Sequence, residues 1–314
     1  MNAWVAAVHA HDIVLHPRMS TAEALHDVAL GCLHHIAANE PAVRAHDGEG
    51  VHQMRVGLRR LRAALAVFSD LLDDAESTHV KAELKWLTGE LSPARDLDVY
   101  VTGNIKPLQS SLPDGRGLDA LRHDLEARRT GSFRRARRAI ESPRYRMLLL
   151  DVLAWIEGGL WTTTDDALIA ALRRRKASDF ARDELARRVE KVTRKAAKLA
   201  KLDPRQRHKL RMAIKTLRYA AKFFAGLFDR PKARKRLHRF ERQLERLQDS
   251  LGALNDITVH ERLAEKVVGR NGRRRQRAFA IGVVSGREQS RIAPLRAAAE
   301  QAAGRFGDVR PFWR

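Results

Sequence analysis

Apolar residues recur every three or four positions along most of the chain. Met54, Leu58, Leu61 and Leu65, for example, gather on one side of a helix drawn at about 100° per residue. Runs of β-branched and aromatic residues that alternate with polar ones, typical of strands, are absent from the sequence. The pattern predicts an all-α fold built from amphipathic helices.

Capping residues indicate where several of these helices should begin. Ser20 is followed three residues later by Glu23, which is the spacing of a capping box. Three further pairs place a capping side chain before a proline suited to a first helical turn: Ser92–Pro93, Ser142–Pro143 and Asp203–Pro204. Glycine-containing breaks are expected at residues 48–50, 113–115, 158–159 and 269–272.

A row of cations lies beside the apolar face of the helix expected around residues 52–62, and it recurs 156 residues later. Positions 0, 3, 7 and 10 of each segment share one helix face, so each row presents its charges in one direction. The first stripe consists of His52, Arg55, Arg59 and Arg62, and the second stripe of His208, Arg211, Lys215 and Arg218, which Lys222 extends by a turn.

The repeat continues beyond the stripes. The pair Arg95–Asp96 matches Asn255–Asp256 at an offset of 160 residues. The sequence therefore predicts an internal duplication that forms two pseudo-symmetric helical bundles. We expect a first half at about residues 20–160, a second half at about 164–305, an N-terminal extension at 1–19 and a C-terminal tail at 306–314.

The charge of the chain narrows the class of partner. A formal net charge of +22 and a pI near 11.0 predict an anionic partner, such as nucleic acid, an anionic membrane or a polyphosphate. No stretch approaches the roughly 20 apolar residues that span a bilayer, and the first residues do not resemble a signal peptide. The single cysteine, Cys32, fits a reducing compartment. We expect a soluble, cytoplasmic protein without a membrane partner.

The stripes admit a structural interpretation as ordinary solvated basic faces. Such faces usually place Glu four residues from Lys or Arg, because like charges at that spacing repel. Neither stripe contains a carboxylate, which favours a ligand-binding role. For His52 and His208, a buried structural hydrogen bond remains the alternative.

No metal site or cofactor is predicted. The chain has 13 histidines, but none lies in an HExxH arrangement or has a cysteine partner at zinc spacing. The cations that share a face with His52 and His208 would also repel a divalent ion.

The two pairs that contain an aspartate, Arg95–Asp96 and Asn255–Asp256, have two interpretations. Near a helix start, their carboxylates would act as caps that the helix dipole favours. Alternatively, Asp96 and Asp256 would support the site by holding stripe arginines in place and offsetting their repulsion. The sequence leaves both interpretations open.

Four motifs together resemble the CHAD family, the conserved histidine α-helical domain: His52–Arg62, Leu91–Val99, His208–Tyr219 and Leu247–Asp256. The resemblance covers about residues 20–305. It implies two helical bundles around a central basic pore or groove, binding of inorganic polyphosphate by the stripe residues and Lys222, and location on polyphosphate granules with other granule-associated proteins. Asn255 departs from the repeat, since the first half has Arg95 there.

We predict non-catalytic binding of inorganic polyphosphate. A phosphoanhydride-cleaving enzyme of the type often joined to such domains would need alternating glutamates on strands, and no ExExK run is present. Readers of single-stranded nucleic acid use aromatic stacking, whereas only 6% of this chain is aromatic. Binding of duplex DNA or RNA through phosphates alone, and a role as an accessory module for an enzyme, remain the alternatives.

Overall fold

The computed structural model describes residues 6–105, 118–268, 282 and 285–314. Within these ranges the chain forms helices and no strand, apart from one isolated bridge between Ser20 and Lys176. The prediction of an all-α fold is confirmed. The helices are α1 (Thr21–Ala38), α2 (Glu40–Arg44), α3 (Gly48–Val67), α4 (Ala75–Tyr100), α6 (Leu118–Glu141), α7 (Pro143–Gly158), α8 (Leu160–Thr163), α9 (Ala167–Arg174), α10 (Ala177–Ala196), α11 (Pro204–Phe223), α12 (Pro231–Val268) and α14 (Ile292–Gly307).

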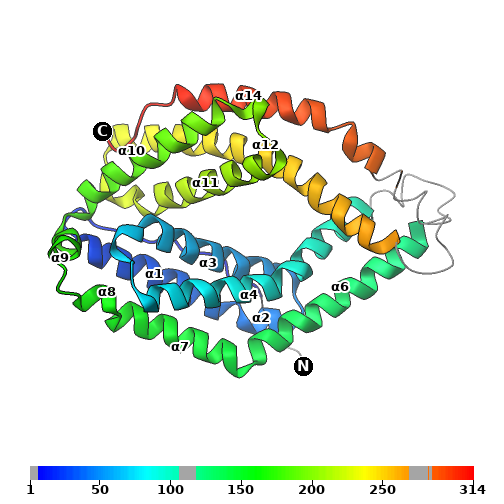
Figure 1. The fold of residues 1–314 in the computed structure, drawn as a ribbon, viewed down its shortest axis with the longest axis horizontal. Helices are drawn as coiled ribbons and strands as arrows, with labels where there is room; N and C mark the ends of the chain where they lie inside the picture. Colours follow the sequence, from blue (N-terminus) through cyan, green and yellow to red (C-terminus); the bar gives the residue numbers. More distant parts are fainter. Residues whose placement is uncertain (1–5, 106–117, 269–281, 283–284) are drawn as a thin grey trace.

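The helices form two groups that meet at α3 and α11 (Figure 1). In the lower group α3 packs against α1 and α4, and α7 lies along the outer edge. In the upper group α11 packs against α10 and α12, and α14 covers α12. Because α3 and α11 also contact each other, the two helices that carry the stripes lie at the centre of the molecule.

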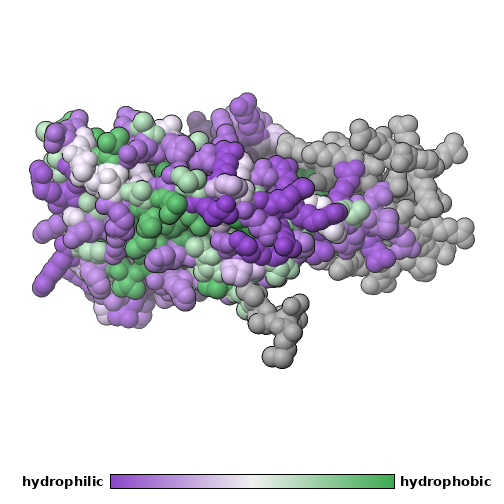
Figure 2. Space-filling view, turned by 90° about the horizontal axis from the view of Figure 1, so that it is seen from below, coloured by the Kyte–Doolittle hydropathy of each residue, from purple (hydrophilic) through white to green (hydrophobic). Residues whose placement is uncertain are grey.

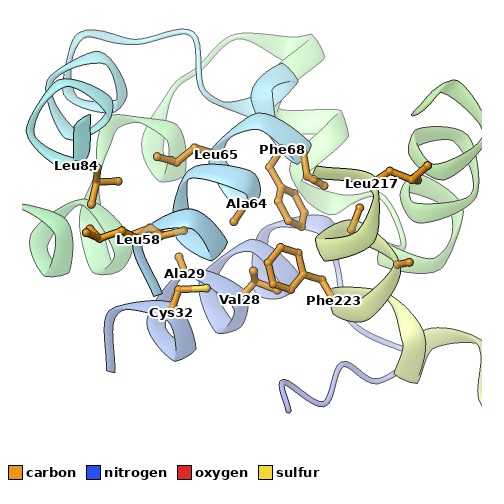
Figure 3. Packing of buried hydrophobic residues seen from close by; sticks show 14 of the residues in the cluster. Val28, Ala29, Cys32, Leu58, Ala64, Leu65, Phe68, Leu84, Leu217 and Phe223 are labelled. Carbon is orange, nitrogen blue, oxygen red and sulfur yellow. The ribbon is translucent and has the colours of Figure 1, made fainter. Parts of the chain in front are cut away.

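One hydrophobic core runs through both groups. Leu58 and Leu65 of α3 belong to the same buried cluster as Leu217 and Phe223 of α11, and Figure 3 shows Phe68 and Phe223 between the two helices. Phe68, just after α3, lies 5.8 Å from Phe224 between ring centroids. The two groups are therefore joined by apolar burial, which holds the stripe helices in a fixed relation.

Most predicted helix starts are confirmed by their caps. Ser20 and Asp203 each form a capping box, and the Ser142 side chain accepts from the backbone N–H of Tyr145. The expected break at residues 158–159 coincides with the end of α7. The break predicted at residues 48–50 is wrong, because Asp47 caps α3 and these three residues form the first turn of that helix. The expected breaks at 113–115 and 269–272 lie outside the described residues.

The helix start predicted at Ser92–Pro93 is wrong. Pro93 lies inside α4, which continues to Tyr100. The Ser92 hydroxyl donates to the carbonyl oxygen of Thr88 at 2.6 Å, a local bond within the helix of the kind that bends helices. Asn255–Asp256 likewise lies within α12, so neither pair that contains an aspartate caps a helix.

The order of elements is the same in both halves. A stripe helix is followed by a short 3₁₀ turn and then by a long helix, as α3, Ser69–Leu71 and α4, and again as α11, Ala225–Phe228 and α12. This order agrees with an internal duplication. The pseudo-two-fold relation between the halves stays a prediction.

The two end segments, which the sequence motifs left unassigned, pack into the core. Leu15 is buried, and the backbone N–H of Val8 donates to the side chain of Asn39 at 3.0 Å. At the other end Phe312 and Trp313 are buried against Phe240, with ring centroids 5.6 and 5.5 Å away. The described parts of both ends therefore stabilise the helical core.

The face formed by the outer edge of the lower group is mainly hydrophilic, with apolar side chains gathered mostly in one half of it (Figure 2). Exposed apolar side chains of α7, the helix along that edge, are Met147, Leu150 and Leu153. None of the stripe residues is on α7, so these exposed apolar side chains and the stripes lie on different helices.

Candidate anion-binding site

The apolar face of α3 fixes the direction of the first stripe. Met54, Leu58 and Leu61 are completely buried, so the neighbouring face of the helix carries Arg55 and Arg59 at the edge of the core. Both arginines are partly buried. Their aliphatic stems thus pack while their guanidinium groups remain available for polar contacts.

The second stripe is fixed in the same way by α11. Leu210, Ile214 and Leu217 are completely buried, and Arg211 and Lys215 lie on the adjoining face, partly buried. Because α3 and α11 contact each other, the two rows of cations lie on neighbouring helices.

Lys215 is the point at which the two stripes meet. Burial, together with the positive charges of Arg211 and Arg59, lowers its pKa to about 7. Arg55 adds to this effect, while the carboxylate of Asp256 opposes it. A lysine under the influence of three arginines from two helices defines a concentrated positive field, which we call the central cluster: Arg55, Arg59, Arg211 and Lys215.

Asp96 compensates one member of the central cluster. Arg55 donates from Nη1 to Asp96 Oδ1 and to the Ser92 carbonyl oxygen, both at 3.1 Å. Its Nε is buried and has no hydrogen-bond partner in the part of the chain that the structure describes. Burial lowers the pKa of Arg55, while Asp96 raises it. The contact is the one that the supporting interpretation of Asp96 expects.

Arg211 has no such ion pair with the described residues. No ion pair joins it to Asp256 within 4.0 Å, and its buried Nε has no hydrogen-bond partner among the described residues. Burial lowers the pKa of Arg211, and Asp256 acts on it only through its charge at longer range. The guanidinium group of Arg211 is therefore less neutralised than that of Arg55.

The two stripe histidines have different neighbours. Burial and the positive charge of Arg95 lower the pKa of His52 to about 4, so its ring is neutral near pH 7. In the second half Asn255 stands in place of Arg95, and its Oδ1 lies 3.2 Å from His208 Nδ1. With a proton on Nδ1, His208 donates to Asn255, and its other ring nitrogen stays free for a ligand.

The far ends of the stripes lie outside the central cluster. Arg62 is exposed. Arg218 donates to Glu245 at 2.8 Å, and with Lys222 it lines a separate hollow of about 450 Å³ that also contains Glu241. These acidic neighbours reduce the local positive potential, so Arg218 and Lys222 are placed less favourably for an anion than the central cluster.

Arg129, which was not predicted from the sequence, completes the first half of the site together with Arg95 and Asp98. Asp98 is buried and accepts from Arg129 at 2.7 Å and from Arg95 at 3.3 Å. The α6 residue Arg129 could not be placed near α4 from sequence spacing alone. Among the described residues, no group of three side chains is arranged to hold a metal ion.

The geometry defines an all-α protein with a paired cationic site on two central helices. Comparison with known proteins identifies its family. The CHAD domain family model matches residues 27–265, and the chain belongs to the CHAD family.

Solved structures agree with this assignment. The crystal structure of the CHAD domain from the plant Ricinus communis is 29% identical, with a TM-score of 0.79 over 95% of this chain and 96% of that chain. PptA from Streptomyces chartreusis is 18% identical, with a TM-score of 0.65 over 90% of this chain and 99% of that chain, which shows a shared fold.

Two curated relatives, uncharacterized proteins from two strains of Mycobacterium tuberculosis, are each 32% identical over 196 residues. The match covers 57% of this chain and 35% of each relative, so the chain spans about a third of their length. None of the described helices is long and apolar enough to cross a membrane.

Proposed function

We propose that this protein binds inorganic polyphosphate without cleaving it, through the two stripes. The observation that carries the proposal is the convergence of Arg59 and Arg211, from different halves, on the partly buried Lys215, whose pKa they lower. Such a cluster of like charges is costly in the free protein, and a bound polyanion would remove that cost.

Polyphosphate fits this cluster for three chemical reasons. It carries a negative charge on every unit, so a row of cations along about 15 Å of helix can follow several phosphates. Arginine forks bind phosphate oxygens through two parallel hydrogen bonds, and lysine supplies a point charge. A bare phosphate chain also needs no stacking surface, and the stripes consist of cations and histidines.

The same proposal includes location in the cytoplasm on polyphosphate granules. It also includes contact with other granule-associated proteins and a role beside a phosphoanhydride-cleaving enzyme. Each would follow from holding a long polyanion. The competing function is general binding of polyanions, since a net charge of +22 attracts duplex DNA and RNA as well.

A competition titration at about 150 mM salt separates the two functions. The protein is loaded with labelled long-chain polyphosphate and challenged with unlabelled polyphosphate, duplex DNA and single-stranded RNA at equal phosphate concentration. Displacement by polyphosphate alone supports a selective site. Equal displacement by DNA or RNA would mean that the charge acts without selectivity.

A variant with all four members of the central cluster changed to Ala tests the site itself. We expect it to lose polyphosphate binding by more than about tenfold while it keeps its helical circular dichroism spectrum. The matched control replaces four exposed cations of the α10 and α12 region, Lys191, Arg194, Lys198 and Lys235. Equal losses in both variants would assign binding to net charge, and unchanged affinity in the first would remove the site assignment. Release of phosphate during the incubation would contradict the non-catalytic role.

A further inference from the structure

A cavity of about 550 Å³ lies between the first turns of α11 and the middle of α12, next to the second stripe. Its cationic and polar wall contains Arg205, Arg207, His208, Arg211 and Asn255. Leu251, Leu254 and Val259 form the apolar side.

The corresponding place in the first half is filled by the protein's own carboxylate. Asp98 Oδ1 accepts from Arg129 Nε and Nη2 at 2.9 and 2.7 Å, and Oδ2 accepts from Arg95. The carboxylate also lies against the start of α3, because a Cβ added to Gly48 would be 2.9 Å from Asp98 Oδ2. An anion held by two arginines thus occupies this end of the first half.

The second half lacks that carboxylate. At the offset of 160 residues that relates Asp96 to Asp256, Thr258 stands where the first half has Asp98, and Thr258 lines the cavity. At the offset of 156 residues that relates the stripes, Glu49 is replaced by Arg205 and Val51 by Arg207. These substitutions remove the internal anion and add cations around the empty space.

The remaining groups around the cavity also leave it positive. Asp203 lines it, but its Oδ1 accepts from the backbone N–H of Gln206 at 2.7 Å as the cap of α11. Arg207 donates to the Leu202 carbonyl oxygen and is under the influence of Arg296, and burial lowers its pKa. The buried Nε of Arg211 has no partner in the described part of the chain.

We propose that this cavity binds the terminal phosphate of a polyphosphate chain, in the place where Asp98 supplies an internal anion in the first half. A terminal phosphate, like a phosphate ester, has a second ionisation near pH 6 and carries almost two negative charges at pH 7, whereas an inner phosphate carries one. It therefore requires a denser group of cations than an inner phosphate. This inference rests on the proposed function, because the rest of the chain would follow the stripes.

The test compares two sets of chains of about ten phosphates. In one set both ends are free. In the other, each terminal phosphate is esterified once with an uncharged group, so that it carries one negative charge like an inner phosphate. We expect the wild-type protein to bind free-ended chains about tenfold more tightly, because only these carry the doubly charged group. Equal affinity for the two chains overturns the inference, while the stripe assignment stays intact.

Thr258→Asp installs the internal carboxylate of the first half in the cavity. We expect it to lower the affinity for free-ended chains about tenfold more than the affinity for end-blocked chains, and so to remove the preference for free ends. Thr193→Asp, at a partly buried position of α10, is the matched control and should keep the preference. A preference that survives Thr258→Asp, or an equal loss for both kinds of chain, overturns the assignment to the chain end.

A second pair of variants covers the case in which Thr258→Asp does not fold. Arg205 and Arg194 are both exposed, so Arg205→Glu and Arg194→Glu change the same charge at a solvent-facing position. Only Arg205→Glu should reduce the preference for free ends. Loss of all binding in the central-cluster variant with an intact preference in Arg205→Glu would support the stripes and reject the end site.

ATP serves as the second source of the same terminal group. Tripolyphosphate should displace labelled free-ended chains at lower concentration than ATP, since the proposed ligand is the end of a bare chain. Displacement by ATP without displacement by tripolyphosphate would overturn that assignment.

Discussion

Arg55 and Asp96 form an ion pair of 3.1 Å that joins the stripe helix α3 to α4. The corresponding residues of the second half, Arg211 and Asp256, form no ion pair within 4.0 Å. One arginine of the duplicated pair is thus already compensated in the free protein, and the other is not. We therefore expect Arg55 to contribute more to the stability of the fold and Arg211 to contribute more to binding.

Arg211→Ala should therefore affect binding more than stability. We expect the affinity for polyphosphate to fall about tenfold, while the unfolding temperature without ligand stays equal or rises, because a partly buried cation without an ion pair is removed. Isothermal titration and thermal unfolding of the same preparation measure the two effects.

Arg55→Ala should show the opposite balance. Its removal leaves Asp96 without its partner and frees the Ser92 carbonyl oxygen, so we expect a loss of stability of about 1–2 kcal/mol. The loss of affinity should be smaller than for Arg211→Ala. If the two variants behave alike in both measurements, the asymmetry between the halves has no functional meaning.

The low pKa of Lys215 predicts that binding depends on pH. In the free protein its pKa is about 7, so the side chain is mostly neutral at pH 8, whereas a bound polyanion favours its charged form. Binding at pH 8 should therefore take up a proton, and affinity should fall between pH 7 and 9. Calorimetry in buffers of different ionisation enthalpy measures the proton uptake, and Lys215→Met should abolish it.

The same residue affects folding with a defined sign. The pKa of Lys215 falls from an ordinary value of 10.5 to about 7, so between these values the unfolded chain binds the additional proton. The free energy of unfolding should then rise with pH across this window because of Lys215. Lys215→Met should stabilise the protein more at pH 7 than at pH 10, and a gain that is independent of pH would contradict the depressed pKa.

The stripes could be predicted from the sequence because helical spacing alone decides which side chains share a face. Their meeting at Lys215 could not, since spacing within one helix does not tell which other helix it faces. The start predicted at Ser92–Pro93 was wrong for a related reason. A capping residue before proline is typical of a first turn, but here the Ser92 hydroxyl bonds within α4 and the helix continues.

The cavity beside the second stripe could not be predicted from the sequence either. The repeat was recognised from the residues that both halves share, whereas the cavity depends on the positions at which they differ, such as Asp98 and Thr258. The partner of Asp98 is Arg129, which is 31 residues away on α6, and only the packing of α6 against α4 brings the two together. The aligned differences were readable in the sequence, but their consequence was not.

The C-terminal residues should be important for stability. Trp313 is buried and its ring lies 5.5 Å from that of Phe240, so Trp313→Ala should cost about 3 kcal/mol. Denaturant unfolding measures this loss. Arg310→Ala, at an exposed position nearby, is the control and should change the free energy of unfolding by less than about 0.5 kcal/mol.

The dependence of binding on salt should report which cations touch the ligand. Each phosphate neutralised by the protein releases counterions, which lowers the slope of log K against log salt by about 0.7 for a single-stranded polyanion. Arg59 makes no hydrogen bond or ion pair with the described residues, so its whole charge is available to a phosphate. Arg59→Gln should make the slope shallower by about this amount.

The control for this slope is Arg234→Gln. Arg234 is exposed and paired with Asp229 at 2.9 Å, on a part of α12 away from the central cluster. It changes the net charge by the same unit but should leave the slope unchanged. A direct phosphate contact releases counterions at Arg59 and not at Arg234, so it changes the slope in one variant alone. Equal changes in both variants would mean that the ligand responds to the total charge of the protein.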